Sequence, residues 1–200
     1  SPTLAWSPMT PAAGPAPPPR MLHSAIYDPT GDRMLVFGGS NGGTGTFNDL
    51  WALSLGGTPT WTQLAPSGNL PSTRFGYTFQ YDPNRQRALL FGGTSDPGPS
   101  KNDLWELTLS GPLAWHQLSP GGTSPSGRYV HYGIYDPIGD RLLVSGGASG
   151  AATLGDVWRL QFSSEVPTAT AIALLSSDAE SDRITLKWAL SGDAATYARL

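Results

Sequence analysis

FGGSNGGTGTFNDLW, which runs from Phe37 to Trp51, is the stretch of sequence that decides the fold. A Gly-Gly pair ends an apolar segment, a glycine-rich stretch follows, and a Trp stands twelve residues after the second glycine of the pair. One interpretation of GGTG at 42–45 is a phosphate-binding loop, but such a loop needs Gly-Lys-Ser/Thr at the opening of a helix. Here the next segment has the pattern of a strand, so the glycines and the Trp need another explanation.

The same markers recur along the chain at a nearly constant step. The Gly pair returns twice at a step of 54 residues, as does Tyr-Asp-Pro, and the Trp returns after steps of 54 and 53. Because several independent markers stay in register, we conclude that the chain contains three copies of one unit. The markers are Gly38, Gly39, Gly92, Gly93, Gly146 and Gly147, then Trp51, Trp105 and Trp158, with Trp61 and Trp115 ten residues after the first two.

Each unit has the pattern of four short strands. In the first unit these are HSAIYD, RMLVFGG, DLWALSL and TWTQLAP, and a Pro/Gly turn joins the first two as a hairpin. No segment shows a sustained helical period, so the sequence predicts an all-β fold.

The glycine pair, the Tyr before the hairpin and the spaced tryptophans resemble kelch repeats, over about residues 1–163. The resemblance implies four-stranded blades packed radially in a β-propeller. We therefore expect three consecutive blades of an incomplete propeller within residues 1–164, with units at about 20–66, 74–120 and 128–164. The glycines would allow a positive φ or a close approach of another backbone segment, and the tryptophans would fill the wedges between blades.

Two features break the repeat. Unit three carries Thr168 where a Trp is due, so that segment is either a degenerate fourth strand or the propeller has ended. Conversely, LAWSPM at 4–9 is an orphan fourth strand, and in many propellers such a strand completes the last blade. Three blades are fewer than the usual four to eight, so we expect missing upstream blades. The upstream face of blade one should then expose apolar surface and promote self-association.

Residues 165–200 differ from the repeats in their sequence pattern. Their strand–turn–strand pattern, with Trp188 and Tyr197 in successive strands, resembles the start of a fibronectin type III or Ig-like β-sandwich. Such a sandwich needs about seven strands. We expect a truncated module here, with only its first strands.

Composition excludes several classes of function. Charged residues make up 14% of the chain, the net charge is −3, and no basic stripe indicates nucleic-acid binding. No run approaches the roughly 20 apolar residues of a membrane span. The chain has no Cys, which excludes disulfides and the Cys–Tyr copper chemistry of some kelch oxidases. The expected setting is a modular exported protein, bacterial and extracellular or at the cell surface.

Catalytic and metal-binding patterns are weak. His23 and His131 hold matching places at the start of the first strand, where unit two has Tyr77, and this favours packing over metal binding. A third histidine, His116, lies elsewhere in its unit. The acidic turn at 178–182 lacks the Gly and the distal Glu of an EF-hand. We predict no catalytic residue, no metal and no cofactor.

Two features suggest ligand binding. Arg20, Arg74 and Arg128 precede the first strand of each unit, and the resemblance places them near the channel mouth. The loops between strands two and three, at 40–48, 94–102 and 148–155, differ between units while the strands agree. The candidate ligand-binding residues are Arg20, Arg74, Arg128, Asn41, Asp96 and Lys101.

The alternative is that each of these arginines only satisfies carbonyls or an Asp of the adjacent blade, and burial separates the two. A second arginine set follows the hairpin turn, and we predict that it pairs across the hairpin with Asp28 and its equivalents. The members of this set are Arg33, Arg87 and Arg141.

The sequence therefore predicts a non-catalytic binding or scaffold module for a protein or glycan ligand. If the arginines are free, we expect this ligand to be anionic. The alternative is a glycan-active or oxidase-type propeller enzyme.

Overall fold

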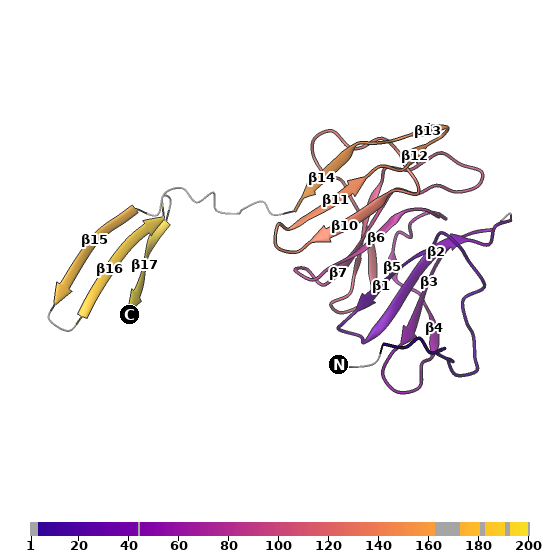
Figure 1. The fold of residues 1–200 in the computed structure, drawn as a ribbon, viewed down its shortest axis with the longest axis horizontal. Helices are drawn as coiled ribbons and strands as arrows, with labels where there is room; N and C mark the ends of the chain where they lie inside the picture. Colours follow the sequence, from indigo (N-terminus) through magenta and orange to yellow (C-terminus); the bar gives the residue numbers. More distant parts are fainter. Residues whose placement is uncertain (1–3, 44, 163–172, 181–182, 191–192, 200) are drawn as a thin grey trace. The chain divides into compact units, whose positions relative to one another are not determined.

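The computed structural model describes residues 4–43, 45–162, 173–180, 183–190 and 193–199, the last three ranges by their backbone alone. The chain divides into two compact units, Ser1–Phe162 and Ser163–Leu200. In the described residues the structure is all-β, which confirms the predicted fold class. Figure 1 shows the strands of the first unit as adjoining twisted sheets.

Blade one is a four-stranded antiparallel meander in the order β1-β2-β3-β4. The strands are β1 (Ser24–Asp28), β2 (Arg33–Ser40), β3 (Thr46–Ser54) and β4 (Trp61–Leu64). In β2 the residues Leu35 and Phe37 are fully buried, and Ile26 of β1 lies beside Leu35 on the same face.

Blade two repeats this order as β6-β7-β8-β9. Its strands are β6 (Thr78–Asp82), β7 (Arg87–Phe91), β8 (Leu104–Thr108) and β9 (Ala114–Leu118). The short strand β5 (Ser67–Gly68), from the connection between the two blades, pairs in parallel with β9 at the outer edge.

Blade three has three strands in the described residues, ordered β10-β11-β14. They are β10 (Tyr132–Asp136), β11 (Arg141–Ser145) and β14 (Val157–Gln161). The expected fourth strand, with Thr168, falls outside the described residues. A small hairpin, β12 (Ala148–Ser149) with β13 (Ala152–Thr153), lies between β11 and β14.

The second unit is an antiparallel meander, with β15 (Ala173–Glu180) and β17 (Asp193–Arg199) on either side of β16 (Arg183–Leu190). The resemblance of this segment to a fibronectin or Ig-like module stays a prediction. The acidic turn at 178–182 includes residues whose placement is not described.

The core of the first unit lies between the blades. Blade one contributes Phe37 and Leu50 to a buried cluster with Phe79, Leu90 and Trp115 of blade two. A smaller cluster joins blades two and three, and the innermost strand β6 contacts both β1 and β10. Blades packed face to face around adjacent inner strands have the arrangement of a propeller.

The glycine pairs make these interfaces possible. Gly38 and Gly92 both have positive φ, 54° and 70°. A Cβ at Gly38 would lie 2.9 Å from the carbonyl oxygen of Arg74, and a Cβ at Gly92 equally close to that of Arg128. The predicted role of the pair, positive φ with close backbone approach, is therefore confirmed for the first two units, where the approaching backbone belongs to the next blade.

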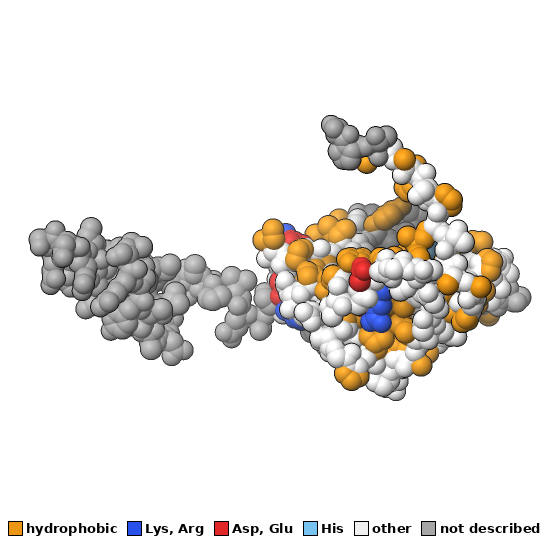
Figure 2. All heavy atoms as spheres, turned by 90° about the horizontal axis from the view of Figure 1, so that it is seen from below, with side chains coloured by type: hydrophobic (Ala, Val, Ile, Leu, Met, Phe, Trp, Pro, Cys, Tyr) orange, Lys and Arg blue, Asp and Glu red, His pale blue; other side chains and the backbone are white. Residues whose placement is uncertain are grey.

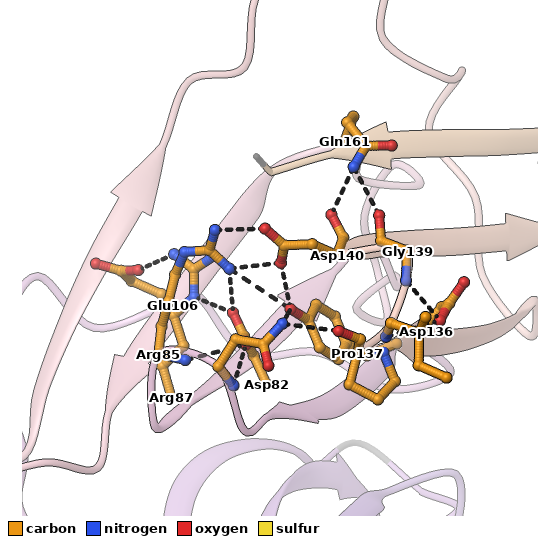
Figure 3. A network of polar contacts seen from close by, with 12 residues as sticks. Asp82, Arg85, Arg87, Glu106, Asp136, Pro137, Gly139, Asp140 and Gln161 are labelled. Atoms are coloured by element: carbon orange, nitrogen blue, oxygen red, sulfur yellow. Dashed lines mark hydrogen bonds and ion pairs between the residues drawn. The ribbon is translucent and has the colours of Figure 1, made fainter. Parts of the chain in front are cut away.

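The hairpin ion pairs are also confirmed. The guanidinium Nε of Arg33, Arg87 and Arg141 each lies 2.8 Å from its predicted Asp. Figure 3 shows the second of these pairs within a network that joins the hairpins of blades two and three, where Arg85 forms an ion pair of 2.6 Å with Asp140.

One expectation about the edge of this unit is wrong. Residues 4–9 form no strand, because no sheet edge lies against them, and Trp6 is fully exposed. Figure 2 shows this segment projecting from the blades, with orange apolar side chains along it. Trp51 and Trp105 are buried, and Trp158 is half-buried.

The expectation for the upstream face of blade one is met only in part. Tyr27 is 52% exposed there, but Val36, Trp51 and Leu53 are buried. The larger apolar exposure lies on blade three. In the part of the chain that the structure describes, no helix is long and apolar enough to span a membrane.

Candidate functional site

The arginines expected at the channel mouth each form the same three-part group. Arg74 donates two hydrogen bonds of 2.8 Å to the carboxylate of Asp103, and Trp105 Nε1 donates a third of 2.6 Å. Nη1 of Arg74 also donates to the carbonyl of Gly92 at 2.9 Å. Arg20 with Asp49 and Trp51, and Arg128 with Asp156 and Trp158, repeat this arrangement in the other two blades.

The charge environment of these aspartates follows from the pairing. Burial by itself raises the pKa of Asp103, but the Arg74 guanidinium and the Trp105 N–H outweigh it and hold the pKa below its usual value. The pKa of Asp49 is lowered against the same opposition from burial. Arg128, followed by the Trp158 N–H, holds the pKa of Asp156 well below its usual range. The carboxylates are therefore ionised and engaged within the protein.

The backbones of Arg74 and Arg128 connect their blades to the one before. The amide of Arg74 donates to the Phe47 carbonyl at 3.0 Å, and its carbonyl accepts from Gly39 N at 2.9 Å. The side chains of Arg74 and Arg128 are fully buried, and that of Arg20 is 4% exposed. The structure thus gives these arginines a structural role between blades, and not the open rim that a ligand needs.

The other three candidate residues lie in the loops between strands two and three. Asn41 is exposed, and its Oδ1 accepts hydrogen bonds from Gly43 N and Gly45 N, which shapes its own loop. Lys101 is half-buried, and its Nζ lies 3.4 Å from Ser95 Oγ. Burial, followed by the charge of Arg74, lowers the pKa of Lys101. Asp96 is exposed and, in contrast to Asn41 and Lys101, it borders a cavity.

The three loops differ in structure as the sequence predicts. In blade one β2 and β3 extend toward each other and leave a short loop at 41–45. In blade two the strands stop earlier and a loop runs from 92 to 103. In blade three the hairpin β12–β13 occupies this place. A fixed set of strands therefore carries three different loop surfaces on one side.

A cavity of about 550 Å³ opens between the loops of blades two and three. The isolated bridges Phe75–Thr94 and Tyr129–Ala148 bring the residue after each buried arginine beside the start of its loop. The half-buried rings of Phe75 and Tyr129 thus border a space whose other polar groups are hydroxyls and one carboxylate. The lining residues are Phe75, Thr94, Ser95, Asp96, Gly98, Pro99, Ser100, Gly127, Tyr129, Ser149 and Gly150.

This loop cavity has the features of a small binding site. Aromatic faces supply apolar contact area, and the hydroxyls supply hydrogen bonds in either direction. Of the described residues that line it, Asp96 alone carries a charge. The charge favours a neutral or cationic group, which departs from the anionic ligand expected for free arginines.

The histidines do not converge. His131 is buried and packs edge-on against Phe91, with ring centroids 5.6 Å apart, whereas His23 and His116 are exposed. Burial, followed by the charge of Arg128, lowers the pKa of His131 to about 4. Among the described residues, no three His, Cys, Asp or Glu side chains are grouped so as to hold a metal ion.

Sequence reasoning missed the partners of the arginines and the aromatic pair of the cavity. The aspartate stands two residues before each repeated Trp, in NDLW, NDLW and GDVW, so its periodicity was a usable signal. Phe75 and Tyr129 directly follow Arg74 and Arg128. No pattern in the sequence says that these rings border a space between two loops.

The chain belongs to the kelch-repeat family. Residues 2–177 match the family described as the KLHDC2/KLHL20/DRC7 Kelch-repeats domain. Host cell factor homolog hcf-1 of Caenorhabditis elegans is 34% identical over 164 residues, which cover 74% of this chain and 20% of that protein.

Two solved structures share the fold. The one described as the structure of YjhT has a TM-score of 0.57 at 16% identity and covers 76% of this chain and 46% of that one. A fungal alcohol oxidase of the AA5 family in complex with copper has a TM-score of 0.56 at 18% identity, over 88% of this chain and 39% of that one. At these identities the likeness shows the fold alone, and the chain spans about a fifth of hcf-1 and less than half of either structure.

Proposed function

We propose that this chain is a protein-binding module whose ligand enters the loop cavity between blades two and three. One observation carries the proposal. The loops between strands two and three differ in structure while the strands keep their register, and two of them enclose a space bordered by the rings of Phe75 and Tyr129. Variable loops on a rigid β-scaffold are where binding residues concentrate.

The ligand that suits this space is a short extended segment of a partner protein. Hydroxyls of Ser95 and Ser149 can form hydrogen bonds to a peptide backbone. The Asp96 carboxylate favours a Lys or Arg side chain, or the N–H groups of the segment. Because the arginines are paired internally, they take no part in this proposal.

Selection of peptides on the immobilised chain tests the proposal. A phage-displayed random peptide library should yield binders whose affinity falls about tenfold or more in Tyr129→Ala, the effect of losing one aromatic anchor. Asp96→Asn should weaken the peptides that carry a basic residue. Asp32→Asn is the matched control, since Asp32 lies in the turn at the opposite end of β2. Peptides that bind Tyr129→Ala and Asp96→Asn as well as the unchanged chain would refute it.

The modular, exported setting expected from the sequence is part of the same proposal. Fractionation of cells that produce this protein with a tag would test it, and a protein confined to the cytoplasm would contradict it.

A further inference from the structure

A second cavity, of about 370 Å³, lies between the outer parts of blades two and three. Its lining is mixed, and its polar part includes Asn102, Gln117 and Arg159. The apolar side chains that line it come from β7, β8 and β9 of blade two and from β11 and β14 of blade three: Phe91, Leu104, Leu118, Leu142, Val144, Trp158 and Leu160.

The same set of positions one repeat earlier surrounds a tryptophan. Trp115 of β9 is 1% exposed, and its ring centroid lies 5.0 Å from that of Phe37 and 6.3 Å from that of Phe79. Its cluster contains the residues that precede the cavity lining by one repeat: Phe37, Leu50, Leu64, Ala88, Leu90, Trp105 and Leu107. The cavity is therefore the place where a fourth-strand tryptophan of blade three would sit.

The strand that would carry this tryptophan is absent from the described part of blade three. β14 pairs with β11 on one edge, and its other edge has no partner among the described residues. In blade two the equivalent edge of β8 pairs with β9, which brings Trp115 into the wedge. An open strand edge beside an open, partly apolar cavity is suited to the addition of a strand.

One segment of this chain matches the missing strand. Leu4-Ala5-Trp6 repeats the tripeptide Leu113-Ala114-Trp115, whose last two residues begin the fourth strand of blade two. Leu113 packs against the cluster around Trp115, whereas Leu4 and Trp6 are 96% and 104% exposed. Such an exposed Trp has a large apolar area to bury.

We propose that Leu4–Met9 of a second copy of this chain adds to β14 as the fourth strand of blade three and places Trp6 in the cavity. The register follows from the pairing of Leu107 with Trp115. By this equivalence Trp6 lies opposite Leu160, and Ser7 lies opposite Arg159. The added strand is the outermost one, a position at which proline is tolerated in a sheet, as Pro8 requires.

A second copy fits better than the same one. Ala12 N donates to the carbonyl of Pro59 at 2.8 Å, which ties the N-terminal segment to blade one. Six residues of extended chain reach about 20 Å from this point. Blade two stands between blades one and three, as Figure 1 shows, so Trp6 would have to pass it to reach its own blade three.

The exchange also covers the open face of blade three. Val157 is 70% exposed, whereas its equivalents Leu104 and Leu50 are 3% and 1% exposed beneath the next blade. In this repeat a fourth strand directly precedes the next blade along the chain, so the added strand brings blade one of the second copy to this face. Reciprocal exchange gives a closed two-fold pair, and its blades total six, within the usual four to eight.

Sedimentation analysis of the whole chain is the first test. The 21.1 kDa chain should shift with concentration to twice its mass. Trp6→Ala should raise the dissociation constant of the dimer at least about tenfold, as expected for removal of a buried aromatic anchor. Ile138→Ala, which truncates a residue 97% exposed in the hairpin of blade three, is the control and should change nothing. A monomer at every soluble concentration, or a dimer indifferent to Trp6→Ala, would overturn the proposal.

A cross-link tests the register. The chain has no Cys, so Ser7→Cys combined with Arg159→Cys places the only two cysteines of each chain at positions that the proposed register sets opposite each other. Oxidation should give a covalent dimer in this variant. Ser7→Cys with Thr62→Cys, on the exposed outer strand of blade one, should give none. Equal cross-linking in both pairs, or a disulfide within one chain, would overturn the inference, as would a fourth strand supplied by residues after Phe162.

Discussion

Blades two and three have the same repeat and the same strand register, but they differ in what surrounds them. Blade two packs between two neighbours, and Phe79, Leu89 and Trp115 are at most 1% exposed. Blade three packs on one side, and its Tyr132 is 85% exposed. The comparison shows that the burial of a repeat position depends on the adjacent blade and not on the residue type alone.

The polar groups differ in the same way. Arg74 and Arg128 have fully buried side chains in equivalent ion pairs. Their aspartates are not equivalent, since Asp103 is 23% exposed and Asp156 is 40% exposed. An identical motif therefore has different access to water in the two blades, and substitutions can measure the consequence.

The largest difference should come from the tryptophans. Trp115→Ala should lower the free energy of unfolding by about 4 kcal/mol, because it removes a fully buried ring from the wedge between blades one and two. Trp158→Ala should lower it by less than half as much, since this ring is half-buried and already borders a cavity. Urea unfolding of both variants checks this, and equal losses would contradict the contrast between the blades.

The arginines should give the next largest difference. Arg74→Ala leaves the Asp103 carboxylate partly buried with only the Trp105 N–H as a side-chain donor, and should lower the free energy of unfolding by about 3 kcal/mol. Arg128→Ala should lower it less, because water reaches Asp156 more easily. Thermal unfolding of the two variants in the same buffer gives the comparison. A larger loss in Arg128→Ala would show that exposure of the carboxylate does not govern the effect.

A smaller and pH-dependent difference concerns the position held by Tyr77 in blade two and His131 in blade three. The pKa of His131 is lowered to about 4, so below pH 6.5 the unfolded chain takes up a proton that the folded chain does not. Stability is therefore full above pH 6.5 and falls toward pH 4, by about 2 kcal/mol between pH 7 and pH 5. Urea titrations at these two pH values should show the loss in the unchanged chain.

His131→Tyr is the matched variant for this test, because it installs the residue of blade two. The Tyr77 hydroxyl of blade two donates to the Phe37 carbonyl of blade one, and Phe91 of blade two holds the equivalent place beside His131 of blade three. The variant should lose most of the pH dependence between pH 7 and pH 5. If it keeps the full dependence, other groups are responsible.

The smallest effect is expected at the solvent-exposed ion pair that joins the hairpins of blades two and three. Asp140→Asn removes the ion pair of Asp140 with Arg85, which is 35% exposed, and should change the free energy of unfolding by less than about 1 kcal/mol. The hydroxyl of Tyr135 also donates to Asp140, within the network of Figure 3. Chemical unfolding at low and high salt checks this, and a loss of several kcal/mol would place the network in the core of the interface.

Much of the fold could be predicted because the repeat is periodic in local signals. The Gly pairs, hairpin turns and Arg33–Asp28 type ion pairs depend on residues close together in sequence, so their spacing was sufficient. The candidate site was harder to predict. Sequence reasoning found the variable loops, but it could not separate a free Arg74 from a buried one, because the partner Asp103 lies 29 residues away.

The sequence by itself determined the class of the fold, the unit length and the positions of the strands, since each blade is a local meander with its own turns and alternation. Tertiary structure alone decided which faces are covered, which arginines are paired, and that two loops enclose a space beside Phe75 and Tyr129. The physical reason is that burial and ion pairing depend on contacts between residues that are far apart in the sequence. A repeat pattern gives the position of each residue within its blade, but it does not say whether a neighbouring blade covers that residue.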